Sequence, residues 1–194
     1  GSYEEIDFYP LAEISDVGAL DAHRWPSTDW FDYSVIPDRI AAARAQHDPC
    51  LMITNGNVFE SSWYMRGFEQ TFVDFLQNPE LPHALFARVT DFYNDHFARI
   101  LAASDGEIDL AFTADDLGGQ TGLLMNLEMW EEFIKPHHAR LNKTIHAFGA
   151  RVIYHTDGAV MEAVPGLVDM GIDVLQALQF SAAGMDPVPL KANH

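Results

Sequence analysis

Short apolar runs alternate along the chain with longer segments of helical periodicity, and this alternation limits the fold more than any other feature. The runs cover 50–54, 108–113, 152–154 and 173–179. The helical segments between and around them include 67–76, 79–104, 126–145 and one that ends at Asp169. Strands that are apolar along their length and separated by helices form a parallel sheet with helices packed outside it. We therefore predict an α/β fold with about four parallel strands and outer helices.

The number of strands predicts part of a (β/α)8 TIM barrel. A closed barrel has eight strands and needs about 250 residues, whereas this chain of 194 residues contains only these four runs. We expect a single domain over 1–194 that is a fragment of a barrel, with a loop-rich segment at 1–48 and βα repeats at 49–194. Unpaired edge strands readily pair with other chains. We therefore expect self-association through the open barrel edges.

The charge of the chain argues against several classes of partner. Its 29 Asp and Glu outnumber its 11 Lys and Arg, which gives a formal net charge of −18. Such a chain repels phosphate backbones and anionic lipids, so we expect no nucleic acid and no membrane partner. No glycine-rich phosphate loop follows a predicted strand. The single Cys50 suits a reducing, cytoplasmic location. The partner that we expect is a small-molecule substrate.

Polar residues gather where the predicted strands end, which is where α/β barrels hold their active sites. Asp115 and Asp116 follow the second strand. Because side chains alternate along a strand, only one of these carboxylates can point into a barrel mouth. It could serve there as a general base, a metal ligand or an acceptor for substrate N–H groups. The alternative is that the pair caps the loop through backbone hydrogen bonds.

His155 and Asp157 end the third strand and lie two residues apart, so they share one strand face. Both could reach one metal ion or one substrate. A metal site needs at least a third protein ligand, and the sequence alone does not identify one. The other interpretation is that Asp157 caps the following helix and His155 makes a structural hydrogen bond.

Residues 57–67 form an aromatic and methionine-rich segment that we interpret as a loop over the barrel top. Trp63 and Tyr64 could line a pocket for a flat ligand, and Arg66 could pair with a substrate carboxylate. Packing of the loop, with Arg66 in a structural ion pair, is equally compatible with the sequence. The candidate substrate-binding residues are Asn55, Trp63, Tyr64, Arg66, Gln120 and Gln179.

Several motifs resemble the uroporphyrinogen decarboxylase superfamily. They are 115–122, 128–141, 152–158 and 171–175, and the similarity extends over most of the chain. The resemblance implies the central part of a (β/α)8 barrel. It also implies one of two chemistries: cofactor-free decarboxylation of the acetate arms of a tetrapyrrole, or zinc-dependent methyl transfer between a corrinoid protein and a thiol.

The resemblance favours a decarboxylase, in which Asp115 or Asp116 would be catalytic and no cofactor would be needed. The family's methyltransferases bind zinc through a His-x-Cys pair, and in this chain His155 is followed by Asp157 in place of the cysteine. A methyltransferase with an altered zinc site and a corrinoid partner is therefore the alternative. A third possibility is an inactive fragment or non-catalytic binding module.

Overall fold

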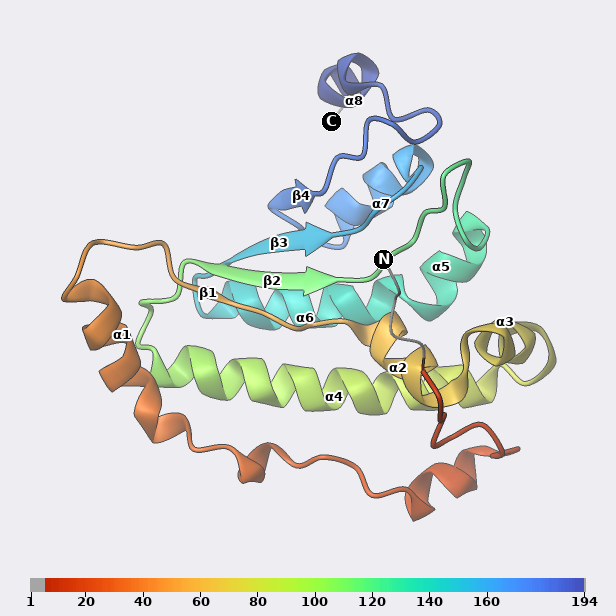
Figure 1. Cartoon of the computed structure of the whole chain (residues 1–194), viewed down its shortest axis with the longest axis horizontal. Coiled ribbons are helices and arrows are strands. Elements are labelled where there is room, and N and C mark those ends of the chain that lie inside the picture. The colour runs from red at the N-terminus through yellow and green to blue at the C-terminus, as the bar shows by residue number, and fades with distance from the viewer. Residues whose placement is uncertain (1–5, 194) are drawn as a thin grey trace.

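The computed structural model describes residues 6–193 and contains one parallel sheet with the strand order β1-β2-β3-β4 (Figure 1). The strands are β1 (Met52–Ile53), β2 (Leu110–Ala114), β3 (Arg151–His155) and β4 (Val174–Gln176). Each strand pairs in parallel with the next one along the chain, and helices connect them. The predicted α/β arrangement with four parallel strands is confirmed.

The helices lie mainly on one side of the sheet, with α4 and α6 running alongside the strands (Figure 1). Asn126 accepts a hydrogen bond from the Met129 amide at 2.8 Å and so begins α5, while Pro136 lies where α5 gives way to α6. The α-helices are α1 (Ile36–Arg44), α2 (Val58–Arg66), α3 (Phe68–Gln77), α4 (Glu80–Ala103), α5 (Leu127–Phe133), α6 (Lys135–Ala147), α7 (Val164–Asp169) and α8 (Pro187–Asn193). Among residues 6–193, no helix combines the length and apolar character needed to cross a bilayer.

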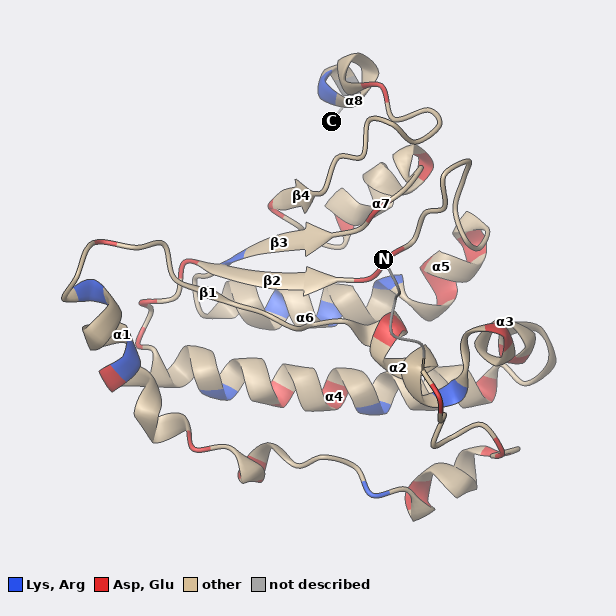
Figure 2. Cartoon of the chain, viewed as in Figure 1, with Lys and Arg blue, Asp and Glu red and all other residues tan. Residues whose placement is uncertain are grey.

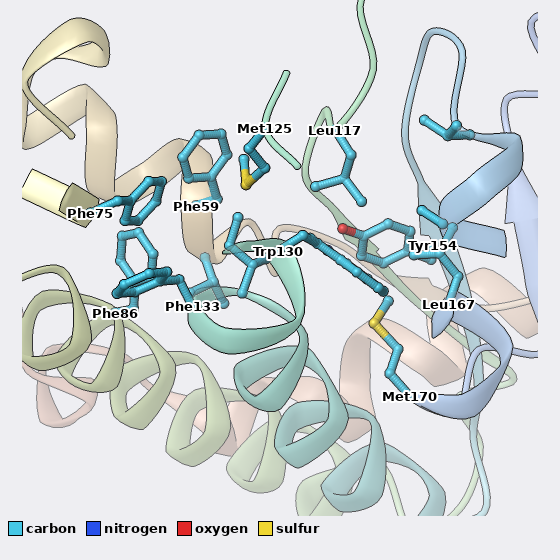
Figure 3. Packing of buried hydrophobic residues seen from close by; sticks show 14 of the residues in the cluster. Phe59, Phe75, Phe86, Leu117, Met125, Trp130, Phe133, Tyr154, Leu167 and Met170 are labelled. Carbon is cyan, nitrogen blue, oxygen red and sulfur yellow. The ribbon is translucent and has the colours of Figure 1, made fainter. Parts of the chain in front are cut away.

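Side-chain alternation gives the sheet one covered face and one open face. Ala111 and Val152 point toward α6, where they pack with Leu141 and Ile145 in a fully apolar cluster. Nearer the C-terminal ends of the strands, a second cluster joins the sheet to α2, α3, α4 and α5 (Figure 3). Its largest side chains are Phe59, Phe75, Phe86, Trp130, Phe133 and Tyr154. On the other face, side chains such as Met52 remain 46% exposed.

Two details of the predicted elements were wrong. The segment at 57–67 is not a loop, because 58–66 form helix α2. Asn57 and Glu60 have the spacing of a capping box, which was the available signal for a helix start. The fourth strand ends at Gln176, and Gln179 lies in the following loop, where its Oε1 accepts a hydrogen bond from the Gly158 amide at 2.9 Å.

The loops after β2 and β3 lie backbone against backbone. The Ala159 amide donates to the Gly119 carbonyl at 2.8 Å, and the Leu117 amide donates to the buried Thr156 hydroxyl at 2.9 Å. A Cβ atom on Gly158 would lie 2.3 Å from the carbonyl carbon of Gly118, and Gly158 also has φ of +89°. Only glycine fits there, because both the space and the dihedral angle exclude a side chain.

We predict that Gly158→Ala lowers the free energy of unfolding by about 2 kcal/mol or more. The new methyl group must displace backbone atoms of the neighbouring loop, and the alanine backbone must adopt a strained φ. Gly122→Ala is the matched control in the same loop region, because no atom lies within 4 Å of its Cβ position. Urea denaturation of both variants measures the difference. Equal stability of the two variants would show that the loops are not in close contact.

Candidate functional site

Three polar side chains converge at the C-terminal ends of β2 and β3, on the open face of the sheet. Ala114 is in register with His155, so Asp116 and Asp157, each two residues further on, continue on the same face. His155 Nε2 lies 3.6 Å from Asp116 Oδ1 and 4.0 Å from Asp157 Oδ2. One ligand atom from each of the three residues lies within 4.8 Å of the other two. We call Asp116, His155 and Asp157 the acidic trio.

Neighbouring strands fix the orientation of His155. Its Nδ1 is 2.5 Å from Gln176 Oε1 on β4, so Nδ1 carries the proton and donates it. The ring also stacks on Phe112 of β2, with centroids 5.9 Å apart. In the neutral ring, Nε2 then presents its lone pair toward Asp116 and Asp157. This is the arrangement of a histidine whose second nitrogen is held by an outer partner.

Asp115 points the other way, into the covered side of the sheet, and is fully buried. Its Oδ2 accepts a hydrogen bond from the Phe59 amide and its Oδ1 accepts one from the Glu60 amide, both at 2.8 Å. His138 of α6 donates from Nε2 to Oδ2 at 2.5 Å. The prediction that only one of the two adjacent carboxylates reaches the mouth is confirmed. The proposed catalytic role of Asp115 is corrected, because its carboxylate holds the N-terminus of α2 and has no access to a ligand.

The remaining predicted site residues are divided among different roles. Arg66 is buried, donates to both oxygens of Asp74 and also donates to three backbone carbonyls. Its guanidinium therefore forms the structural ion pair, and its predicted role in binding a substrate carboxylate is withdrawn. Trp63 packs edge-on against Tyr64 at 4.1 Å between ring centroids. Gln179 Nε2 donates to Gln120 Oε1 at 3.0 Å, which links two of the loops around the acidic trio.

A hollow of about 440 Å³ lies beside this site, between the end of β1, helix α2, helix α4 and the N-terminal segment. Asn55 and Tyr64 line it, as do Asn57 and Glu60, which the sequence reasoning did not select. Asn57 Nδ2 donates to Glu60 Oε2 at 2.5 Å. We call this feature the β1 hollow.

The electrostatic environment of both features is negative. Burial raises the pKa of the Glu60 carboxyl, and the charges of Asp115 and Asp116 act in the same direction. Among the described residues, His155 is the only Lys, Arg or His side chain with a nitrogen within 4.0 Å of the Asp116 or Asp157 carboxylate. Lys and Arg lie instead on the helices, in the N-terminal segment and at the opposite end of β3, while Asp and Glu mark the C-terminal end of β2 (Figure 2). The site therefore suits a cation or a hydrogen-bond donor better than an anion.

Residues 49–179 match the sequence model of the family described as Uroporphyrinogen decarboxylase (URO-D). The chain belongs to the uroporphyrinogen decarboxylase family. A solved structure described as a methyltransferase from Methanosarcina mazei has a TM-score of 0.67 and 13% sequence identity to it. The similarity covers 87% of this chain and 48% of that one, so the chain spans about half the length of the methyltransferase. No curated protein sequence matches the chain.

The uroporphyrinogen decarboxylase family assignment confirms the predicted resemblance and, with the structural similarity, the partial TIM-barrel fold. The matched region contains the whole acidic trio and the residues of the β1 hollow that follow β1 or belong to α2 and α4. Asp116 was selected as a catalytic candidate and His155 and Asp157 as metal ligands. The tertiary structure places these three residues next to one another.

We predict that Asp115→Ala lowers the free energy of unfolding by about 3 kcal/mol or more, because it leaves two buried amides and His138 without their acceptor. Asp116→Asn should lower the free energy of unfolding by less than about 1 kcal/mol, since that side chain is 43% exposed and asparagine keeps the Oδ1 acceptor. Chemical denaturation of the two variants tests the contrast. A larger loss in the Asp116 variant would contradict the assignment.

His137, beside His138 on α6, should make stability dependent on pH. Burial lowers its pKa from 6.5 to about 4. The unfolded chain therefore binds this proton at a higher pH than the folded protein, so stability falls as the pH decreases from about 6.5 to about 4, by about 3 kcal/mol at most. We expect His137→Gln to lose less stability than the wild type over this interval in urea titrations. His47→Gln, at an exposed position, should behave as the wild type.

Proposed function

We propose that the chain forms the metal-binding part of a methyltransferase-type enzyme of the uroporphyrinogen decarboxylase family. Asp116, His155 and Asp157 would hold one divalent cation. The convergence of these three side chains is the observation that carries the proposal, because it supplies the third ligand that the sequence could not identify. The structurally similar protein is described as a methyltransferase, which supports the same reaction class.

The donor set fits a cation such as zinc. Zinc binds imidazole nitrogen and carboxylate oxygen at about 2.0–2.2 Å, which places tetrahedral ligand atoms about 3.4 Å apart. The separations of 3.6 Å and 4.0 Å from His155 Nε2 exceed this slightly, so small side-chain rotations would close the site. The half-exposed Asp157 side chain leaves access for a substrate. A cation held by these three residues would supply Lewis-acid chemistry.

The protein's own residues have distinct tasks in this proposal. Gln176 holds His155 in the tautomer that offers Nε2 to the cation. The Asp157 amide donates to Asp116 Oδ1 at 2.9 Å and so holds this carboxylate beside His155 Nε2. Gly158 lets the two loops approach closely enough for both aspartates to reach one point. Gln120 and Gln179 in the loops around the acidic trio, and Asn55 and Tyr64 in the β1 hollow, are the candidate substrate contacts.

Asp157 stands where the resemblance places a zinc-binding cysteine. A carboxylate is a harder ligand than a thiolate, and it does not activate a thiol in the way that a thiolate-rich zinc site does. We therefore propose a corrinoid-linked or related methyl-group substrate and leave thiol methylation as the less suitable reaction.

Cofactor-free decarboxylation of a tetrapyrrole is the second candidate. The family description supports it, and the turn at Asp157 and Gly158 is held by hydrogen bonds to Asp116 and Gln179, which suits a structural turn. In this case Asp116, rather than Asp115, would accept hydrogen bonds from pyrrole N–H groups. The negative surroundings weaken this candidate, because the acetate arms of the substrate are anionic.

The share of the methyltransferase that this chain covers matters for both candidate functions. Since the chain spans about half of the methyltransferase, we propose that activity requires residues beyond this chain, and that the chain alone would be inactive. The free edges of β1 and β4 among the described residues also make self-association a proposal.

Elemental analysis of the purified protein, with any affinity tag removed, tests the metal. We expect about one divalent cation per chain after incubation with zinc and dialysis. His155→Ala and Asp157→Ala should each remove it, because two protein ligands do not hold zinc firmly.

Glu128→Gln provides the control, since Glu128 is exposed and lies on α5 outside the acidic trio. Its metal content should equal that of the wild type. A wild-type protein that retains no metal after this treatment would refute the proposal and favour decarboxylation.

A further inference from the structure

The β1 hollow is distinct from the acidic trio and has its own walls. Phe31, Phe92 and His96 supply rings on one side. Phe92 and His96 stack with an interplanar angle of 11°, and Phe31 lies 4.7 Å from His96 between ring centroids. Tyr33 fixes the imidazole through a 2.7 Å hydrogen bond between its hydroxyl and Nδ1. The hollow therefore offers aromatic surface that is held in place before any ligand arrives.

The side of the hollow next to β1 is polar and rich in acceptors. Asn55 lines this side and has a left-handed backbone with φ of +77°. Among residues 6–193, neither the Asn55 side-chain amide nor Asn57 Oδ1 makes a hydrogen bond. The Glu60 carboxylate, bonded to the Asn57 amide, has no cationic partner in the same part of the chain. These groups are available to a ligand that donates hydrogen bonds.

The lining contains no Lys or Arg among the described residues, whereas Asp115 and Asp116 add negative potential next to Glu60. An anionic ligand would be repelled and would find no counter-ion. A volume of about 440 Å³ lies at the lower end of the range for small-molecule sites. A ligand with one or two flat rings matches both the size and the aromatic walls.

We propose that the β1 hollow binds a planar, amino-substituted nitrogen heterocycle of one or two rings. Its ring would pack against Phe92 and His96, and its amino and ring N–H groups would donate to Glu60 and Asn57. Such a ligand would be a second substrate or cosubstrate placed beside the acidic trio. The hollow requires no metal, so this proposal does not depend on a cation at the acidic trio.

Isothermal titration calorimetry with 2,4-diaminopyrimidine tests the site, with orotate as an anionic pyrimidine of similar size. Titrations are done after dialysis against a chelator, so that failure of the metal site cannot affect the result. We expect 2,4-diaminopyrimidine to bind and orotate not to bind. Glu60→Gln should weaken binding about tenfold or more, because a charged acceptor is replaced by a neutral amide.

Phe92→Leu should also weaken binding, through loss of the ring contact, while leaving the metal content unchanged. Glu69→Gln and Phe148→Leu are matched controls outside the hollow and should bind as the wild type. Circular dichroism of each variant shows that it is folded. Absence of diaminopyrimidine binding at millimolar concentration, equal binding of orotate, or indifference to both hollow variants would overturn the proposal.

Discussion

The carboxylate of Asp115 receives hydrogen bonds from two elements that are far from it in sequence: the first turn of α2 and His138 on α6. A fully buried acid of this kind is stable only when its acceptors are satisfied. The same three contacts set the start of α2 against the end of β2. They therefore place Glu60 and the β1 hollow on one side and Asp116 on the other. The chemistry of the site depends on this buried junction, although Asp115 itself reaches no ligand.

Close backbone packing between the loops after β2 and β3 complements this junction. Gly118 and Gly158 allow the two loops to touch, and the hydrogen bond from the Asp157 amide to Asp116 joins their tips. These contacts connect the two loops and place Asp116 and Asp157 beside His155. Rigid supports of this kind hold functional groups in place before a ligand binds. The exposed carboxylates are thus positioned by groups that are themselves buried.

Negative charge is concentrated where the strands end, and positive charge is kept away from it. Arg66 is neutralised by Asp74 inside the structure, and the remaining Lys and Arg lie on helices, in the N-terminal segment or at the other end of the sheet (Figure 2). This separation gives the acidic trio and the β1 hollow a shared preference for cations and N–H donors. The ligands proposed for the two features nevertheless differ. The acidic trio offers ligand atoms to an ion, and the β1 hollow offers aromatic walls to a flat ring.

The sequence by itself determined the order of the four strands and of the helices around them except α2, the face shared by His155 and Asp157, and the opposite directions of Asp115 and Asp116. These follow from local periodicity and from side-chain alternation, which act over a few residues. Only the tertiary structure decided that Asp116 joins His155, that Arg66 is buried against Asp74, and that α2 begins at a carboxylate 55 residues away. Those outcomes depend on strand register and on packing between distant segments, and no spacing along the chain encodes them.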